Sequence, residues 1–429
     1  MIKRTLLTVV AAAGLALAAS APALAAQPYP INFKNFPLGS YASISGVTES
    51  GGSVTLASTG LGSFTYTDPF ANYSNDGADG SGPYQSGTWT SPDYSTSFGF
   101  NELVASWNAI TPNGTWIQVE MQPKMLDGHW AKSYILGRWS SSDSDFHRTS
   151  VGGQGDADGF VSIDTWFAKD HQAVAYRLKV TLFRRAGSSA TPTLTRLNAV
   201  AMNLNNQKMN FPSATTITAQ TARDLGLPKY SQEIHHGHFP QYDNGGEAWC
   251  SPTSTSMVVS FWGSSFMPTP TEYQWVTDAL GASTPDPWVD YTARAVYDYH
   301  YNGAGNWPFN AAYAASRGLV ADVTALHNLK EAEPYINAGV PLVASVAWES
   351  NKLDGGIKST NGHLMVIGGF TANGNVIAYD PASDTDALVR HVYDREQFER
   401  AWIPASGGIV YVIRTAGTNI NSLLTANNS

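Results

Sequence analysis

The pattern of apolar residues changes once along this chain of 429 residues. Up to about residue 205, short runs alternate apolar and polar side chains, as in Ile117–Met121 and Tyr176–Leu182. A period of two is typical of strands with one buried face, so many such runs predict an all-β sandwich, of the jelly-roll type, over residues 27–205. The chain is too long for one hydrophobic core, and a second domain is therefore expected.

The second half has a different pattern. Residues 206–235 are rich in Thr and Ser and are broken by proline, which predicts a linker. Over residues 236–429, helices are expected first and antiparallel strands afterwards, which makes an α+β domain. Helices are predicted just after Cys250 and near 272–280, 289–300, 309–317 and 329–338, and strands over 340–348, 363–370, 376–379 and 408–413. A shorter chain that begins near Arg223 is expected to fold alone.

The N-terminus carries the features of a secretory signal peptide. Lys3 and Arg4 precede an apolar run, Leu6–Ala19, and then Ala23-Leu24-Ala25. Cleavage is expected after Ala25 or Ala26, so residues 1–26 are predicted to be removed and the protein to be secreted into the extracellular space. A membrane anchor is the weaker alternative, because the run is shorter than the ~20 residues that span a bilayer. No membrane span is expected after removal of the signal.

The charge excludes one class of partner. Loss of Lys3 and Arg4 with the signal takes the formal net charge from −9 to −11, and the sequence has no basic run. Nucleic-acid binding is therefore not expected. With 43% hydrophobic and 14% charged residues, the composition is that of a globular protein.

The chain has a single cysteine, Cys250. Exported proteins usually use cysteines in disulfide pairs, and a free thiol outside the cell is open to oxidation. A lone cysteine is easier to understand there if its chemistry is needed. Its position at the start of a predicted helix, with Pro252 in the first turn, would favour a thiolate through the helix dipole. The alternative is a buried small hydrophobic residue.

Two later segments carry the other candidate catalytic residues. Asn361-Gly362-His363 opens a predicted strand, and Asp380 ends the next one, after a turn at Asn373-Gly374. Neighbouring antiparallel strands would bring His363 and Asp380 together, so that the acid orients the imidazole that serves Cys250. The alternatives are a hydrogen-bonded structural histidine and a turn-forming Asp before Pro381.

Three strings carry a resemblance to a known family. WCSPTS followed by a helix, GHLMVIGGF and YDPA occur in this order within residues 230–415. Together they resemble the bacteriocin-processing (double-glycine) cysteine peptidase family and its secreted C39-type relatives. The resemblance implies a papain-like fold and hydrolysis of peptide bonds in a peptide or protein substrate. It also implies Cys250 as nucleophile, His363 as base and Asp380 as orienting acid.

In that family a glutamine upstream of the cysteine helps to form the oxyanion hole. Gln241 is the matching candidate, although its distance from Cys250 is longer than the family's usual gap. Its alternative role is that of an ordinary polar loop residue, and Gln232 is the rival donor. The family's transporter members carry membrane and ATP-binding domains that are not recognisable in this sequence.

Metal and cofactor motifs are not expected. His235, His236 and His238 suggest zinc, but they lack companion ligands in sequence, so a solvated loop is the preferred interpretation. Asp156 and Asp158 suggest calcium, but an EF-hand ligand set is missing, which favours a turn.

The function of the N-terminal half is left open. It contains several tryptophans, of which Trp116 shares a predicted face with polar residues and is expected to be exposed. They suggest a cell-wall or glycan ligand, or else a core. For the whole protein, the leading hypothesis is a secreted cysteine peptidase. The alternatives are a cell-wall amidase or acyltransferase with the same residues, and a non-catalytic surface-binding protein.

Overall fold

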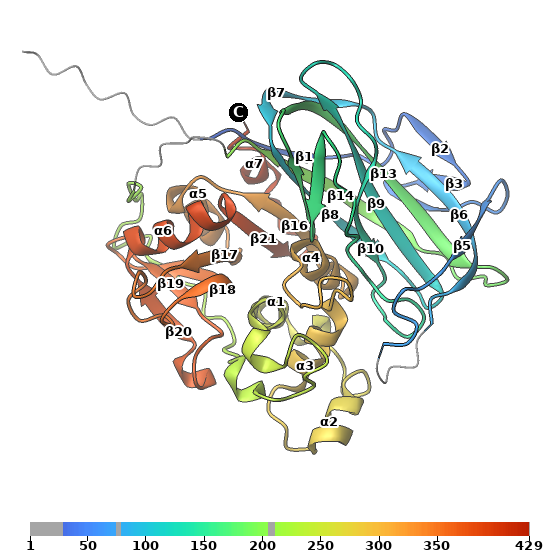
Figure 1. Cartoon of the computed structure of the whole chain (residues 1–429). Helices are drawn as coiled ribbons and strands as arrows, with labels where there is room; N and C mark the ends of the chain where they lie inside the picture. The colour runs from blue at the N-terminus through green and yellow to red at the C-terminus, as the bar shows by residue number, and fades with distance from the viewer. Residues whose placement is uncertain (1–28, 74–78, 205–210, 429) are drawn as a thin grey trace, which may run out of the picture.

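The computed structural model describes residues 29–73, 79–204 and 211–428, so the predicted signal peptide lies outside the described residues. A β-rich region is followed by a region of helices and a further sheet (Figure 1). Within the described ranges, no helix is long and apolar enough to cross a membrane.

Residues 31–202 form two antiparallel sheets, each with seven strands among the described residues. The first has the order β11-β12-β8-β14-β4-β3, with β1 paired to β14, and the second has the order β10-β9-β13-β6-β2, with β5 on β6 and β7 on β13. The strands are β1 (Ile31–Asn35), β2 (Ser43–Ser45), β3 (Val47–Ser50), β4 (Ser53–Leu56), β5 (Gly62–Tyr66), β6 (Gly82–Thr90), β7 (Tyr94–Phe100), β8 (Glu102–Ile110), β9 (Thr115–Met125), β10 (Tyr134–Trp139), β11 (Gly159–Ser162), β12 (Thr165–Ala168), β13 (Ala173–Arg185) and β14 (Thr193–Met202).

The alternation in the sequence corresponds to the buried face of these sheets. Ile117, Val119 and Met121 of β9 are fully buried, and so are the apolar residues of Tyr176–Leu182 on the paired strand β13. Side chains from both sheets meet in one hydrophobic core, in which Trp107 of β8 and Trp89 of β6 take part. The two sheets therefore cover each other's apolar faces.

The tryptophans of this region are mostly core residues. Trp116, expected to be exposed, is fully buried, and that expectation was wrong. Its ring stacks on Phe146 and Phe183 at centroid distances of 4.4 and 3.8 Å. The second face of β9 is thus covered by aromatic side chains as well, which alternation alone could not indicate. The other fully buried tryptophans here are Trp89, Trp107, Trp139 and Trp166.

The following region contains the predicted helices and strands. Its sheet has the order β16-β21-β17-β18-β19-β20, with the short β15 paired to β18. The helices are α1 (Cys250–Trp262), α2 (Gln274–Leu280), α3 (Pro287–Val296), α4 (Trp307–Ser316), α5 (Leu329–Asn337), α6 (Arg395–Ser406) and α7 (Asn421–Leu424), and the strands are β15 (Arg223–Asp224), β16 (Val320–Ala325), β17 (Leu342–Trp348), β18 (Thr360–Phe370), β19 (Val376–Tyr379), β20 (Arg390–Tyr393) and β21 (Ile409–Arg414). The strand β15 lies within the residues that the sequence predicts to be a linker.

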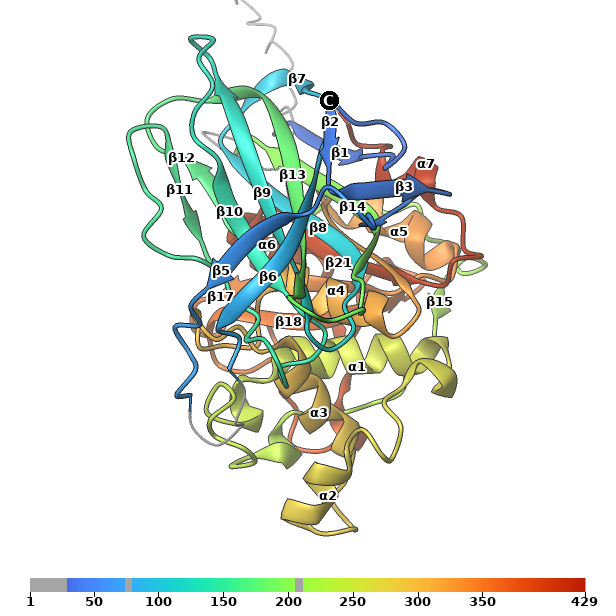
Figure 2. The ribbon, with the colours of Figure 1, turned by 90° about the vertical axis from the view of Figure 1, so that its right-hand side faces the viewer.

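The two regions pack closely against each other. The strand β16 and the helix α4 contact β8 of the first sheet, and Figure 2 shows α1, α2 and α3 beneath the β-rich part. Phe309 of α4 contributes to the core between the N-terminal sheets, while Ile31 and Val200 belong to the core of the C-terminal sheet. Such shared burial argues against the expectation that the chain beyond Arg223 folds alone.

A buried ion cluster lies at the same boundary. Asp322 of β16 is fully buried, and its oxygens accept from Arg196 of β14 at 2.5 Å and from Arg414 of β21 at 2.7 Å. Asn198 donates to the same carboxylate at 2.6 Å. The charge of Asp322 is therefore paired by side chains from both regions, as a buried carboxylate requires.

Candidate active site

Cys250 is the first residue of α1, where the sequence predicts a helix start. Its backbone N–H is one of those that have no acceptor within the helix, and the positive end of the helix dipole lies at its side chain. Two buried serines fix this end of the helix. Ser251 is 3.0 Å from the Tyr411 hydroxyl of β21, and Ser254 donates to the Leu364 carbonyl of β18 at 3.0 Å. The helix that carries the thiol is thus tied to the strand that carries His363.

His363 and Asp380 form a buried pair. Because Val366 of β18 lies opposite Tyr379 of β19, Asp380 follows the end of β19 beside His363. The Nε2 atom of His363 lies 2.7 Å from Oδ1 of Asp380, and both side chains are buried. With Nε2 engaged by the acid, Nδ1 is the imidazole nitrogen left for Cys250.

The electrostatics favour a charged pair. Burial alone would lower the pKa of His363, but the Asp380 charge and hydrogen bond, together with the contact with Cys250, outweigh it and raise this pKa to about 10. Burial likewise opposes ionisation of Asp380, yet the His363 charge and the hydrogen bonds from His363, Tyr393 and the Ala382 amide lower its pKa to about 2. At neutral pH the pair is an imidazolium and a carboxylate.

Two further aromatic residues support this pair. The Tyr393 hydroxyl of β20 donates to Oδ2 of Asp380 at 2.7 Å, so both carboxylate oxygens are engaged. The Trp348 ring stands edge-on to the His363 imidazole, with the centroids 6.0 Å apart. Neither residue was found from the sequence, because nothing in its pattern indicates that β20 or the end of β17 reaches Asp380 or His363.

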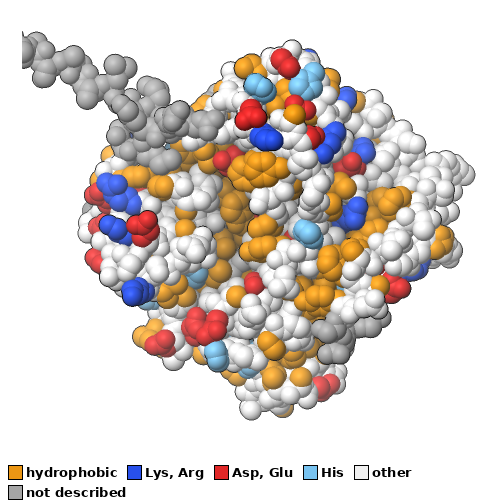
Figure 3. Space-filling view, viewed as in Figure 1, with side chains coloured by type: hydrophobic (Ala, Val, Ile, Leu, Met, Phe, Trp, Pro, Cys, Tyr) orange, Lys and Arg blue, Asp and Glu red, His pale blue; other side chains and the backbone are white. Residues whose placement is uncertain are grey.

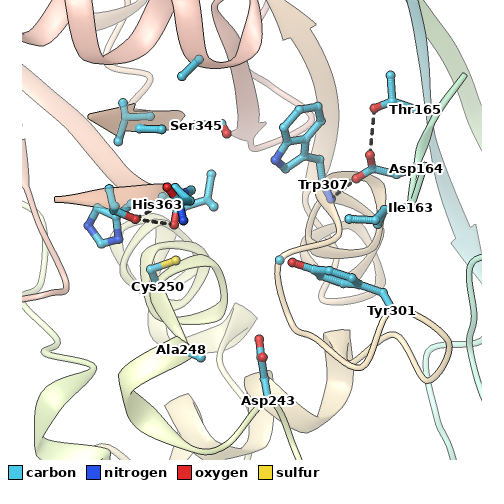
Figure 4. A pocket seen from close by; sticks show the side chains of 18 of the residues that line it. Ile163, Asp164, Thr165, Asp243, Ala248, Cys250, Tyr301, Trp307, Ser345 and His363 are labelled. Carbon is cyan, nitrogen blue, oxygen red and sulfur yellow. Dashed lines mark hydrogen bonds between the residues drawn. The ribbon is translucent and has the colours of Figure 1, made fainter. Parts of the chain in front are cut away.

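Cys250 and His363 line one cavity of about 480 Å³. They face it from one side, while Ile163, Tyr301 and Trp307 face it from the other (Figure 4). In the space-filling view, which shows the same face of the molecule as Figure 1, hydrophobic side chains gather along a hollow in the middle (Figure 3).

The two candidate glutamines differ in their position relative to the cavity. Among its described lining residues, Gln232 is present and Gln241 is not. The Gln241 carbonyl accepts from the Tyr73 hydroxyl of the N-terminal region at 2.8 Å, so this segment turns toward the boundary between the regions. The structure therefore brings Cys250, His363 and Asp380 together but leaves out Gln241.

Gln232 is held tightly in the wall of the cavity. Its amide Nε2 donates to the Glu247 carbonyl at 2.6 Å, and its backbone N–H donates to the Pro381 carbonyl at 2.9 Å. The side chain is only 3% exposed, and within the described part of the chain its Oε1 has no partner. A Cβ at position 246 would lie 2.4 Å from the Gln232 carbonyl oxygen, so Gly246 is what allows this close approach.

The histidine segment that suggested zinc is not a solvated loop throughout. His235 is fully buried and His238 partly so, and each places Nδ1 at 2.9 Å from one oxygen of the buried Asp290 of α3. The possible ligand atoms of these three residues lie within 4.8 Å of one another, so that, among the residues the structure describes, this group could hold a metal. The Nδ1–oxygen distances are those of hydrogen bonds, which anchor the segment before Cys250 to α3.

Comparisons with known proteins give a family for both regions. Residues 33–202 match the Peptidase C39 N-terminal domain, and residues 225–410 match the Peptidase C39 like family. No curated protein sequence matches the chain.

Matches to solved structures are weak. A structure of infectious bursal disease virus Gt strain has a TM-score of 0.19 and 10% identity, over 46% of this chain and 37% of that one. The endo-1,4-β-D-xylanase 10B modules of Clostridium thermocellum with xylohexaose have a TM-score of 0.19 and 9% identity, over 46% and 32%. A structure of PfGH50B has a TM-score of 0.18 and 8% identity, over 49% of this chain and 33% of that one. The matched part is about a third of each of those chains, and at these TM-scores the likeness carries no argument.

The family matches cover the sheets of the N-terminal region and the segments that carry Cys250, His363 and Asp380. The chain belongs to the C39-type cysteine peptidase family.

Proposed function

We propose that the protein is a secreted cysteine peptidase that uses Cys250, His363 and Asp380 as a catalytic triad. One observation carries the proposal: Cys250 lines one cavity with His363, and His363 is hydrogen-bonded to the buried Asp380. We also propose a papain-like arrangement for residues 225–410, in which a helix that begins at the nucleophile packs against the strand of the base. For the N-terminal region we propose a sandwich, which its two sheets around one core support.

The proposed mechanism follows from the imidazolium form of His363 in its pair with the Asp380 carboxylate. The Cys250 thiolate attacks the carbonyl carbon of a peptide bond, and the carbonyl oxygen becomes an oxyanion. The His363 imidazolium gives its proton to the leaving amine as the C–N bond breaks, which leaves a thioester on Cys250. Neutral His363 then takes a proton from water, whose hydroxide attacks the thioester and releases the carboxylic acid and the thiolate.

The oxyanion needs donors that are already in place. The Cys250 backbone N–H and the Gln232 amide are the donors that we propose, because Gln232 lines the cavity and Gln241 does not. Asp380 remains ionised throughout and holds the imidazole in position.

The test is cleavage of an unbiased peptide library, read by mass spectrometry. The protein beginning at Gln27 is expected to cleave peptides, and Cys250→Ala is expected to cleave none. The family match favours a peptidase over an amidase, an acyltransferase or a non-catalytic binding protein. A fully reduced wild-type protein that leaves every peptide intact would contradict the proposal.

A further inference from the structure

Part of one wall of the cavity comes from the N-terminal region. The turn between β11 and β12, with Ile163 and Asp164, lines the side opposite Cys250 and His363 (Figure 4). Tyr301 and Trp307, which precede or begin α4, complete this wall. The cavity is therefore built jointly by the two regions.

Two buried carboxylates fix this wall. Each accepts a hydrogen bond from a backbone N–H of the other region. Asp164 of the N-terminal region accepts from the Trp307 backbone N–H at 2.7 Å. Asp298 of the C-terminal region accepts from the Ser150 backbone N–H at 2.9 Å and from the Tyr301 N–H at 3.2 Å. Both carboxylates are buried, and burying them is unfavourable unless they are hydrogen-bonded. The segment from Asp298 to Trp307 is thus held at both ends.

Ile163 has an unusual backbone conformation. Its φ is 57°, in the left-handed region, which is strongly disfavoured for a β-branched residue. Such a conformation persists only where the surroundings enforce it, and it is often found at ligand-binding sites. Here the next residue, Asp164, is fixed by Trp307 and by the Thr165 hydroxyl, which donates at 2.9 Å. As a result, an aliphatic side chain faces the cavity (Figure 4).

Ile163, Tyr301 and Trp307, the more exposed side chains of this wall, are apolar or aromatic. Tyr301 is 41% exposed although it is a large side chain, and Ile163 and Trp307 are partly exposed. Among the described residues that line the cavity, none is a lysine or an arginine. A volume of about 480 Å³ is typical of ligand pockets, which apolar and aromatic side chains mostly line.

We infer that Ile163, Tyr301 and Trp307 form a specificity wall that receives a large apolar or aromatic side chain of the peptide substrate near the scissile bond. The N-terminal region then takes part directly in the choice of substrate. This inference rests on the proposed peptidase function, since the wall lies across the same cavity from Cys250.

The test compares two matched peptides, chosen from the library cleavage sites, with a large apolar residue or glycine at the preferred position. Ile163→Gly is the first variant, because glycine accepts a φ of 57° and the fold should survive. Tyr301→Ala is the second. Leu126→Ala is the control, since Leu126 is an apolar residue of the N-terminal region, 65% exposed, outside the cavity lining.

Both wall variants are expected to lower kcat/KM for the apolar peptide by about 10- to 200-fold and to leave the glycine peptide nearly unchanged. The rate at which iodoacetamide modifies Cys250 should stay at the wild-type value, and Leu126→Ala should match wild type throughout. If wild type prefers the apolar peptide and both wall variants keep that preference, the inference is overturned, while the proposed peptidase function stands. Carboxylates such as Asp243 also line the cavity. If wild type prefers lysine or arginine at this position, these carboxylates set the preference and the inference is overturned. If the wild-type protein cleaves no peptide, the proposed function and the inference fall together.

Discussion

The Nε2 atom of His363 lies 2.7 Å from Oδ1 of Asp380, and both side chains are buried. This contact leaves Nδ1 for Cys250, and the proposed mechanism gives His363 and Asp380 distinct roles. In the mechanism that we propose, His363 moves protons, and Asp380 orients the imidazole and stabilises its charge.

The first prediction separates these roles. His363→Ala should abolish peptide cleavage, while Asp380→Asn should retain more activity, because an amide oxygen can still accept from the imidazole. Cleavage rates of the two purified variants, with circular dichroism to verify folding, make the comparison. Equal loss in two well-folded variants would show that the division of roles is wrong.

The second prediction concerns stability and pH. The pKa of His363 is raised from 6.5 to about 10, so its contribution to stability is complete below pH 6.5 and is lost as pH rises toward 10. The pKa of Asp380 is lowered from 3.8 to about 2, so its contribution is complete above pH 3.8 and is lost as pH falls toward 2. The unfolding free energy that Asp380→Asn removes should therefore be largest between about pH 4 and 6.5 and should shrink toward pH 10. Denaturant titrations at several pH values measure it, and a difference that grows with pH would be contrary to this assignment.

The third prediction tests the oxyanion donor. Gln232→Ala should lower kcat by ~10²–10³ with little change in KM, because the amide acts mainly on the transition state. Gln241→Ala is the matched control and should keep kcat near the wild-type value. Loss of kcat in Gln241→Ala with normal kcat in Gln232→Ala would reverse the assignment.

The fourth prediction concerns the boundary between the regions. Asp322→Ala should lower the unfolding free energy by ~3–5 kcal/mol, because it leaves the charges of Arg196 and Arg414 without their shared partner. Glu396→Ala, which removes an exposed ion pair with Arg400, should change it by less than about 1 kcal/mol. Equal effects of the two substitutions in denaturant titrations would argue against a buried cluster.

A related prediction follows for a shortened protein. A chain that begins at Arg223 lacks Ile31 and Val200, which belong to the core of the C-terminal sheet. It should therefore aggregate or unfold rather than retain activity, as shown by size-exclusion chromatography. A soluble, cooperatively folded and active fragment would show that the shared core is dispensable.

Local patterns in the sequence were enough for most elements. Pro252 after Cys250 indicated the start of α1, and the apolar run after His363 indicated β18. Contacts between segments distant in sequence were harder to predict. Gln241 is nearer to Cys250 along the chain than Gln232, but the close packing at Gly246 brings Gln232 to the cavity. Ile163 could not be connected with Cys250, because only the packing of the two regions makes them share a cavity.

The most direct test of the account is the rate at which iodoacetamide modifies Cys250 as a function of pH. The chain has a single cysteine, so the reaction reports on this thiol alone. A thiolate held by the His363 imidazolium predicts rapid modification that persists at pH 5–6, far above the rate of free cysteine, and that is lost in His363→Ala. A rate that matches free cysteine and falls away below neutral pH would contradict the assignment of Cys250 as the activated nucleophile.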